Sequence, residues 1–117
     1  YAEALTLAQK VGISPERFDS VIRGSRMDCG FYQTFMGYTL EGNREAHKFT
    51  LTNGRKDMTY LESMADAAGV ANPIGNAVKN SFAMAVSTGG DGAEDYIPHL
   101  PVFVGRWNGV DMTPKKS

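Results

Sequence analysis

Two pairs of helix stop and start signals limit the folds open to this chain. In the first pair, Gly12 ends a helical pattern and Ser14-Pro15 begins the next. In the second pair, Gly69 ends a pattern and Asn72-Pro73 begins another. Glycine favours the left-handed residue that closes a helix, a serine or asparagine side chain caps the next helix, and proline suits its first turn. Links this short join neighbouring helices, so the pattern predicts helices packed on helices.

Apolar residues between these signals recur at the spacing of an α-helix. Helices are expected over residues 2–11 and 15–22, from residue 49 or 51 to 68, and from 73 to the glycine-rich break at 89–92. The residues expected to face the core are Ala4, Leu5, Ala8 and Val11; Phe18, Val21 and Ile22; Gly54, Met58, Leu61, Ala65 and Ala68; and Ile74, Ala77, Val78, Phe82, Ala85 and Val86.

The remaining segments give weaker signals. Residues 31–40 are aromatic, and they fit a helix by the spacing of Phe31, Phe35 and Tyr38 but not by their Gly37. Residues 93–99 are expected to form one short helix stopped by Pro98 and Pro101. No strand pattern is convincing. The sequence therefore predicts an all-α fold of five to six helices, in a single domain over 1–117 with frayed final residues 113–117.

Composition excludes several classes of function. Twelve Lys and Arg against 13 Asp and Glu give a net charge of −1, which leaves no basic excess for nucleic acid. No apolar run approaches the roughly 20 residues that cross a bilayer. Cys29 is the one cysteine, so no disulfide forms within the chain, which fits a reducing, cytoplasmic compartment. The chain starts at Tyr1 inside a helical pattern, and we expect it to be part of a longer protein.

The stretch from Phe49 to Met58 carries the strongest candidate for chemistry. At about 100° per residue, Phe49, Asn53 and Lys56 share one side of the helix, and Asp57 lies between that side and the apolar side. A lysine can bind an anionic group, an aspartate can orient it or accept a hydroxyl proton, and an aromatic ring can wall a planar ligand. On spacing alone, an ordinary solvated helix start is the more common explanation.

Other reactive residues do not form recognisable sites. His47 and His99 lie 52 positions apart, and with Cys29 they give no metal-ligand spacing, so no metal site is expected. The segment 89–92 is glycine-rich but lacks the patterns of phosphate-binding loops. No nucleophile elbow surrounds Ser14, Ser20, Ser25 or Cys29. The six methionines suit helix interfaces.

An ordered set of motifs resembles the C-terminal helical domain of the β-hydroxyacid dehydrogenases, of the 6-phosphogluconate-dehydrogenase-like type. This family includes 3-hydroxyisobutyrate dehydrogenase, tartronate semialdehyde reductase and the glyoxylate and succinic semialdehyde reductases. The matching motifs run over about residues 2–100: Ala2-Glu3-Ala4-Leu5 to Gly12-Ile13-x-Pro15, then Gly24-Ser25, Phe49-x6-Lys56-Asp57-Met58, Ala68-Gly69-Val70-x-Asn72-Pro73, and Gly89 to Tyr96. Asp28-Cys29 replaces the Ser-Trp of many relatives, and 101–117 is an atypical tail.

The resemblance implies roles for particular residues. Lys56 would contact NAD or NADP, bound mainly by an N-terminal Rossmann domain of the same protein that is not in this sequence. Asp57 and Phe49 would line the cleft where a small carboxylate substrate reacts. The family's catalytic lysine and its glycine-rich dinucleotide motif would lie upstream of Tyr1.

The sequence leaves two competing functions open. The first is a substrate and dimerisation domain of an NAD(P)-dependent 3-hydroxyacid dehydrogenase or semialdehyde reductase, inactive by itself and part of a homo-oligomer. The alternative is a stand-alone α-helical interaction module without catalysis, which would use its methionine- and aromatic-rich helices as a partner groove.

Overall fold

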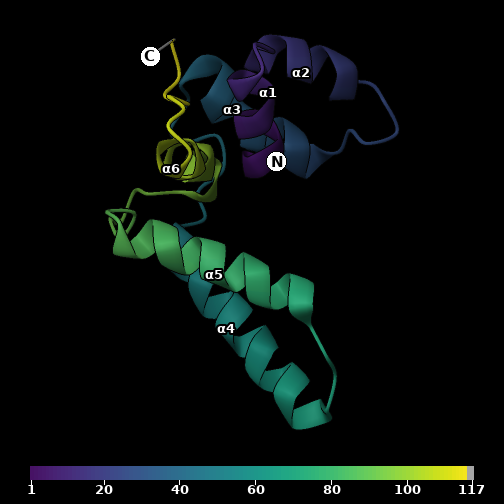
Figure 1. Ribbon diagram of the computed structural model, residues 1–117, viewed down its shortest axis with the longest axis vertical. Coiled ribbons are helices and arrows are strands. Elements are labelled where there is room, and N and C mark those ends of the chain that lie inside the picture. Colours follow the sequence, from purple (N-terminus) through teal and green to yellow (C-terminus); the bar gives the residue numbers. More distant parts are fainter. Residues whose placement is uncertain (116–117) are drawn as a thin grey trace. The chain divides into compact units, whose positions relative to one another are not determined.

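A computed structural model describes residues 1–115 of the protein (Figure 1). Its helices are α1 (Ala2–Lys10), α2 (Pro15–Ile22), α3 (Gly30–Glu41), α4 (Leu51–Ala68), α5 (Pro73–Ser87), the 3₁₀ helix η1 (Ile97–His99) and α6 (Leu100–Trp107). No strand occurs in the described residues, so the predicted all-α class is confirmed. The chain divides into two units. Unit 1 comprises Tyr1–Lys48 and the described residues from Tyr96 onward, and unit 2 comprises Phe49–Asp95.

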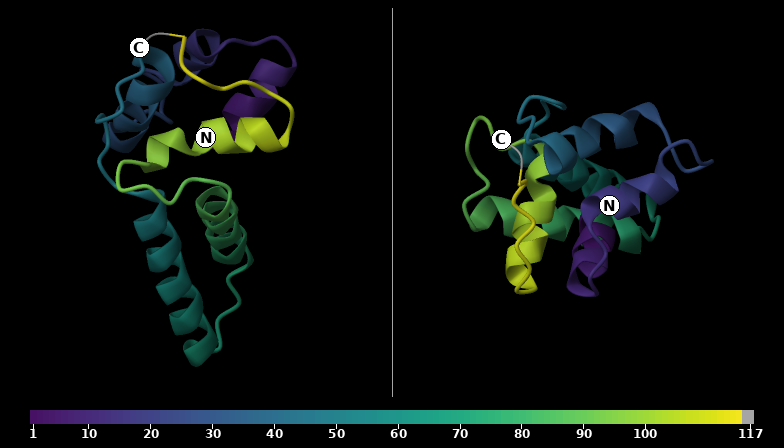
Figure 2. Two further views of the ribbon diagram at one scale, coloured as in Figure 1. Left: turned by 90° about the vertical axis from the view of Figure 1, so that its left-hand side faces the viewer. Right: turned by 90° about the horizontal axis from the view of Figure 1, so that it is seen from above.

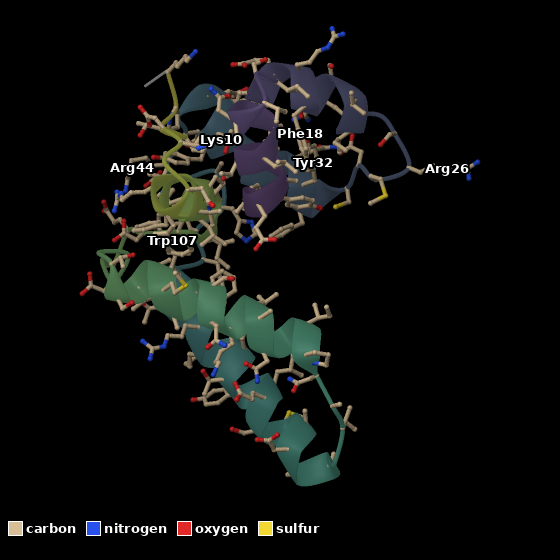
Figure 3. All side chains as sticks on the ribbon, viewed as in Figure 1. Lys10, Phe18, Arg26, Tyr32, Arg44 and Trp107 are labelled. Carbon is tan, nitrogen blue, oxygen red and sulfur yellow. The ribbon has the colours of Figure 1, made fainter. Side chains whose placement is uncertain are left out.

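Unit 1 holds a hydrophobic core built from both of its chain segments. The core contains Leu5 of α1, Tyr32, Phe35 and Met36 of α3, and Val110 and Met112 after α6. Phe18, Ile22, Leu40 and Ile97 pack against it. Figure 3 shows Phe18 and Tyr32 close together inside this unit. Residues far apart in the sequence therefore complete one core.

The predicted helix ends in unit 1 are confirmed. Gly12, which follows the C-cap residue Val11 of α1, has φ of +90°, a backbone conformation that glycine adopts without strain. The Ser14 hydroxyl accepts a hydrogen bond from the Arg17 backbone N–H at 3.1 Å, and Pro15 opens α2. The aromatic segment proves to be helix α3, whose C-cap Gly42 has φ of +69°.

The predicted core faces of unit 1 are only partly right. Leu5 and Ala8 are buried as expected. Ala4, Val11 and Val21 are exposed, and Ala2 and Thr6 are buried instead. A periodic pattern identifies an apolar stripe along a helix. Which edge of that stripe is buried depends on where the neighbouring helices pack.

The prediction that Pro98 and Pro101 stop a helix is wrong. Both prolines lie in the first turn of a helix, Pro98 in η1 and Pro101 in α6, where their missing N–H groups need no partner. Residues 93–96 form no helix. After α6, the chain passes so close to Gly105 that an added Cβ atom there would lie 2.6 Å from the Val110 carbonyl oxygen. This close approach brings Val110 and Met112 into the core.

Unit 2 is an antiparallel hairpin of α4 and α5 (Figures 1 and 2). Thr50 caps α4, which the sequence analysis did not predict, and Gly69, with φ of +70°, closes it as predicted. Pro73 opens α5, but the expected side-chain cap from Asn72 is absent. Lys79 of α5 pairs with Glu62 of α4 at 2.8 Å.

Few of the residues predicted to face the core of unit 2 are buried. Gly54, Ala65, Phe82 and Ala85 are buried, whereas Leu61, Ala68, Ile74, Ala77 and Val78 are exposed. Two helices can cover only the seam between them, so the rest of each apolar stripe stays open.

No helix among residues 1–115 is both long enough and apolar enough to cross a membrane.

Candidate functional site

The first turns of α4 carry the residues that the sequence singled out. Thr50 precedes the helix with an extended backbone, and its hydroxyl accepts a hydrogen bond from the Asn53 N–H at 3.1 Å. This cap satisfies one of the amides that an α-helix leaves unpaired at its N-terminus. Phe49 lies one residue before the cap and is half-buried. The start of α4 thereby fixes the backbone that carries Asn53, Lys56 and Asp57.

Lys56 and Asp57 are close to one another and open to solvent. The Lys56 Nζ atom lies 3.7 Å from Asp57 Oδ1, with side chains 51% and 54% exposed. The same ammonium group donates to Asn53 Oδ1 at 3.5 Å. Both distances are long, and solvent screens exposed pairs of this kind. Lys56 can therefore exchange these partners for an anionic ligand at little cost.

This arrangement fits one contact with a dinucleotide rather than a whole binding site. An ammonium group near a helix N-terminus suits a phosphate or carboxylate oxygen. A dinucleotide, however, is usually cradled by a glycine-rich turn between a strand and a helix. Residues 1–115 contain no strand, and the glycine-rich stretch 89–92 links α5 to η1. The described residues show an exposed lysine at the start of α4 but no such cradle.

The histidines have local partners in unit 1. His47 Nδ1 lies 3.1 Å from the Thr34 hydroxyl, and its ring meets the edge of Phe31. His99 is buried, its Nδ1 accepts a hydrogen bond from the Tyr96 N–H, and its ring packs on Tyr38. Within residues 1–115, no three His, Cys, Asp or Glu side chains are grouped to hold a metal ion.

The possible nucleophiles serve as caps and turns. Ser14 caps α2, and the Cys29 sulfur accepts from the Tyr32 N–H at 3.5 Å at the start of α3. The Ser25 hydroxyl accepts from the Met27 N–H, and the Ser20 hydroxyl donates to the Arg17 carbonyl. Each of these contacts gives the hydroxyl or thiol group a role in local structure.

A polar cluster that the sequence did not reveal joins α2 to α3. The Tyr32 hydroxyl donates to Asp19 Oδ1 at 2.8 Å, and Arg23 Nε donates to Asp19 Oδ2 at 2.9 Å. Burial, together with this carboxylate, raises the pKa of Tyr32. Nearby, the Gly24 N–H donates to Asp28 and lowers the pKa of that carboxyl group. An open groove runs past Asp19 and Arg23, but both carboxylate oxygens of Asp19 are already bonded, so the cluster is structural.

Replacing the cap of α4 should loosen the start of this helix. We expect Thr50→Ala to destabilise the protein by about 1 kcal/mol, since the Asn53 N–H loses its side-chain acceptor. Urea unfolding followed by circular dichroism measures the change. Thr52→Ala is the matched control, because Thr52 is exposed within the same turn and does not cap α4. Equal effects of the two substitutions would contradict the capping role of Thr50.

A family model described as NAD-binding of NADP-dependent 3-hydroxyisobutyrate dehydrogenase matches residues 1–99. The match places the chain among the NAD(P)-dependent oxidoreductases. The chain belongs to this 3-hydroxyisobutyrate dehydrogenase family. No curated protein matches the chain.

Proposed function

We propose that the chain is the C-terminal helical domain of an NAD(P)-dependent oxidoreductase that acts on a small hydroxy acid or semialdehyde. The observation that carries this proposal is the family match over residues 1–99. The ordered motifs support it, above all Phe49-x6-Lys56-Asp57, which lie in and just before the first turns of α4.

The proposed division of labour places the cofactor mainly on another domain. An N-terminal Rossmann domain of the same protein would hold NAD or NADP. The catalytic lysine would also lie upstream of Tyr1. The absence of a strand–loop–helix cradle from residues 1–115 is consistent with this division. When bound, the nicotinamide ring supplies or accepts the hydride.

The proposed role of this chain is to close and polarise the cleft. Lys56 gives up its weak bonds to Asn53 and Asp57 and contacts the bound nucleotide. Asp57 then orients Lys56 or accepts a hydrogen bond from the substrate hydroxyl. Phe49 covers the planar ring and excludes water, which strengthens the polar contacts inside the cleft. We further propose that the substrate carries a carboxylate and that the intact enzyme is a homo-oligomer.

The test compares the isolated chain with the intact protein. We expect the intact protein to oxidise 3-hydroxyisobutyrate or a related small hydroxy acid with NAD or NADP, followed by absorbance at 340 nm, and the 117-residue chain to be inactive. Turnover by the isolated chain would refute the proposed division of labour. An intact protein that neither binds a dinucleotide nor turns over these substrates would favour the stand-alone interaction module.

A further inference from the structure

Two asparagines in the chain are followed directly by glycine, in the pairs Asn53-Gly54 and Asn108-Gly109. In such a pair the backbone nitrogen of the glycine can attack the side-chain amide of the asparagine, because glycine has no side chain to hinder it. A bond forms between this nitrogen and Cγ, the Cγ–Nδ2 bond breaks, and the displaced nitrogen leaves as ammonia with the backbone amide proton. Water then opens the cyclic imide to aspartate or isoaspartate.

The two pairs differ in how firmly the glycine amide is held. The Gly54 N–H donates to the Thr50 carbonyl at 2.9 Å, and Gly54 is buried in α4, so its amide cannot turn toward a side chain without unwinding the helix. Asn108 and Gly109 are exposed in the turn after α6. The Gly109 nitrogen lies 3.3 Å from the Arg106 carbonyl oxygen, beyond the usual range of such hydrogen bonds. The second pair therefore has the more available nitrogen.

Lys10 of α1 binds the peptide group that joins Asn108 to Gly109. Helices α1 and α6 lie side by side in unit 1 (Figure 2). The Lys10 Nζ atom donates to the Asn108 carbonyl oxygen at 3.0 Å. When the Gly109 nitrogen loses its proton, the negative charge is shared with this oxygen. A charge-assisted hydrogen bond from an ammonium group stabilises that anion, and so it favours the attack on the side-chain amide.

We propose that Asn108 is a self-modification site of this chain, at which Lys10 promotes ring closure onto the Gly109 nitrogen with loss of ammonia. Water is the one other reactant. The site lies wholly within unit 1 and is separate from the residues of α4, so it does not rest on the proposed oxidoreductase function.

The modification removes a contact that holds the end of α6. The Asn108 Nδ2 atom donates to the Val104 carbonyl at 2.8 Å, one of the carbonyls that an α-helix leaves unpaired at its C-terminus. This nitrogen is lost as ammonia, and the carboxylate that replaces it lies at the negative end of the helix dipole. Isoaspartate also lengthens the backbone by one carbon just before the close approach of Val110 to Gly105. The modified chain should therefore melt at a lower temperature.

Peptide mapping by mass spectrometry, after incubation of the 117-residue chain in mildly alkaline buffer, tests the proposal. Trypsin places the two asparagines in separate peptides, and replacement of a side-chain NH₂ group by OH gives the mass shift. Isomerisation at Asp91-Gly92 gives no mass shift and is not counted. We expect Asn108 to react about tenfold faster than Asn53, a factor that corresponds to breaking one backbone hydrogen bond.

Lys10→Met separates the effect of the lysine from that of the Asn-Gly sequence. This variant should slow the reaction at Asn108 about tenfold by removing the charge-assisted bond, and leave Asn53 unchanged. Lys10→Arg keeps the positive charge and should retain most of the rate. In urea, where the fold is lost, Lys10→Met and the wild type should react equally. Lys10 is exposed, so both variants should fold, which circular dichroism verifies.

Three results would overturn the proposal. They are a reaction at Asn108 no faster than at Asn53, a folded Lys10→Met chain that reacts as fast as the wild type, and a difference between these two chains that persists in urea. A modified chain, separated by ion exchange, that melts as high as the unmodified one would contradict the loss of the contact with Val104. None of these measurements involves turnover or dinucleotide binding, so the oxidoreductase function is tested separately.

Discussion

A chain ended at His99 is expected to lose the folded structure of unit 1, although the family match covers all the residues that remain. The truncation removes four large side chains that are buried in the complete chain: Phe103, Val104, Val110 and Met112. Burying each is worth about 1.5–3 kcal/mol, and so roughly 6–12 kcal/mol together. This loss is comparable to the whole stability of an ordinary domain, about 5–15 kcal/mol.

Thermal unfolding followed by circular dichroism measures the effect. The truncated chain should show no cooperative transition for unit 1 and weak near-ultraviolet signals from its aromatic residues. Met112→Ala provides a milder version, with an expected cost of about 2–5 kcal/mol, because Met112 is buried in the core. Thr113→Ala is its control, since Thr113 is exposed. If the truncated chain unfolds at the temperature of the complete one, residues 100–115 do not contribute to the core.

Helix ends were predictable because their causes are local. Gly12 and Gly69 take left-handed backbone conformations, and Ser14 bonds an amide three residues ahead. Such signals need no knowledge of distant residues. The prolines at 98 and 101 carried the same kind of signal, since proline also favours the first turn of a helix. Interpreting them as stops led to the one missing helix, α6.

Burial was less predictable because it depends on neighbours that the sequence does not place. The stripe through Ile74 and Val78 has the spacing of a core face, yet α4 covers only the part near Phe82. The hydrogen bond from Tyr32 to Asp19 joins residues 13 positions apart on two helices, and no local sequence pattern predicts it. Val110 and Met112 enter the core only because the chain passes closely by Gly105.

The candidate site could be predicted from the sequence only in part. The helical spacing placed Asn53 and Lys56 on one side of α4, and the hydrogen bond between them agrees with that placement. The roles of Lys56, Asp57 and Phe49 stay predictions, because they concern a cofactor and a further domain that are themselves proposed. The weak partners of Lys56 are consistent with a residue whose main partner is a ligand.

Lys56→Ala in the intact protein is expected to lower kcat/KM by about ten- to a hundredfold. A hydrogen bond from a charged group to a ligand contributes about 1.5–3 kcal/mol, and each 1.4 kcal/mol is a factor of ten. The loss should appear mainly in the KM for the dinucleotide if Lys56 binds it equally in the ground and transition states. The folded structure should be unchanged, because the Lys56 side chain is half exposed and makes only long contacts.

Arg55→Ala is the matched control for this prediction. Arg55 is exposed, has the same charge and lies next to Lys56, but points about 100° away around α4. Removing it changes the net charge equally without removing the proposed contact. Steady-state kinetics with NAD and with NADP, alongside direct dinucleotide binding, separates the two variants. Equal effects of Lys56→Ala and Arg55→Ala would show that the charge of α4, rather than a contact from Lys56, acts on the cofactor.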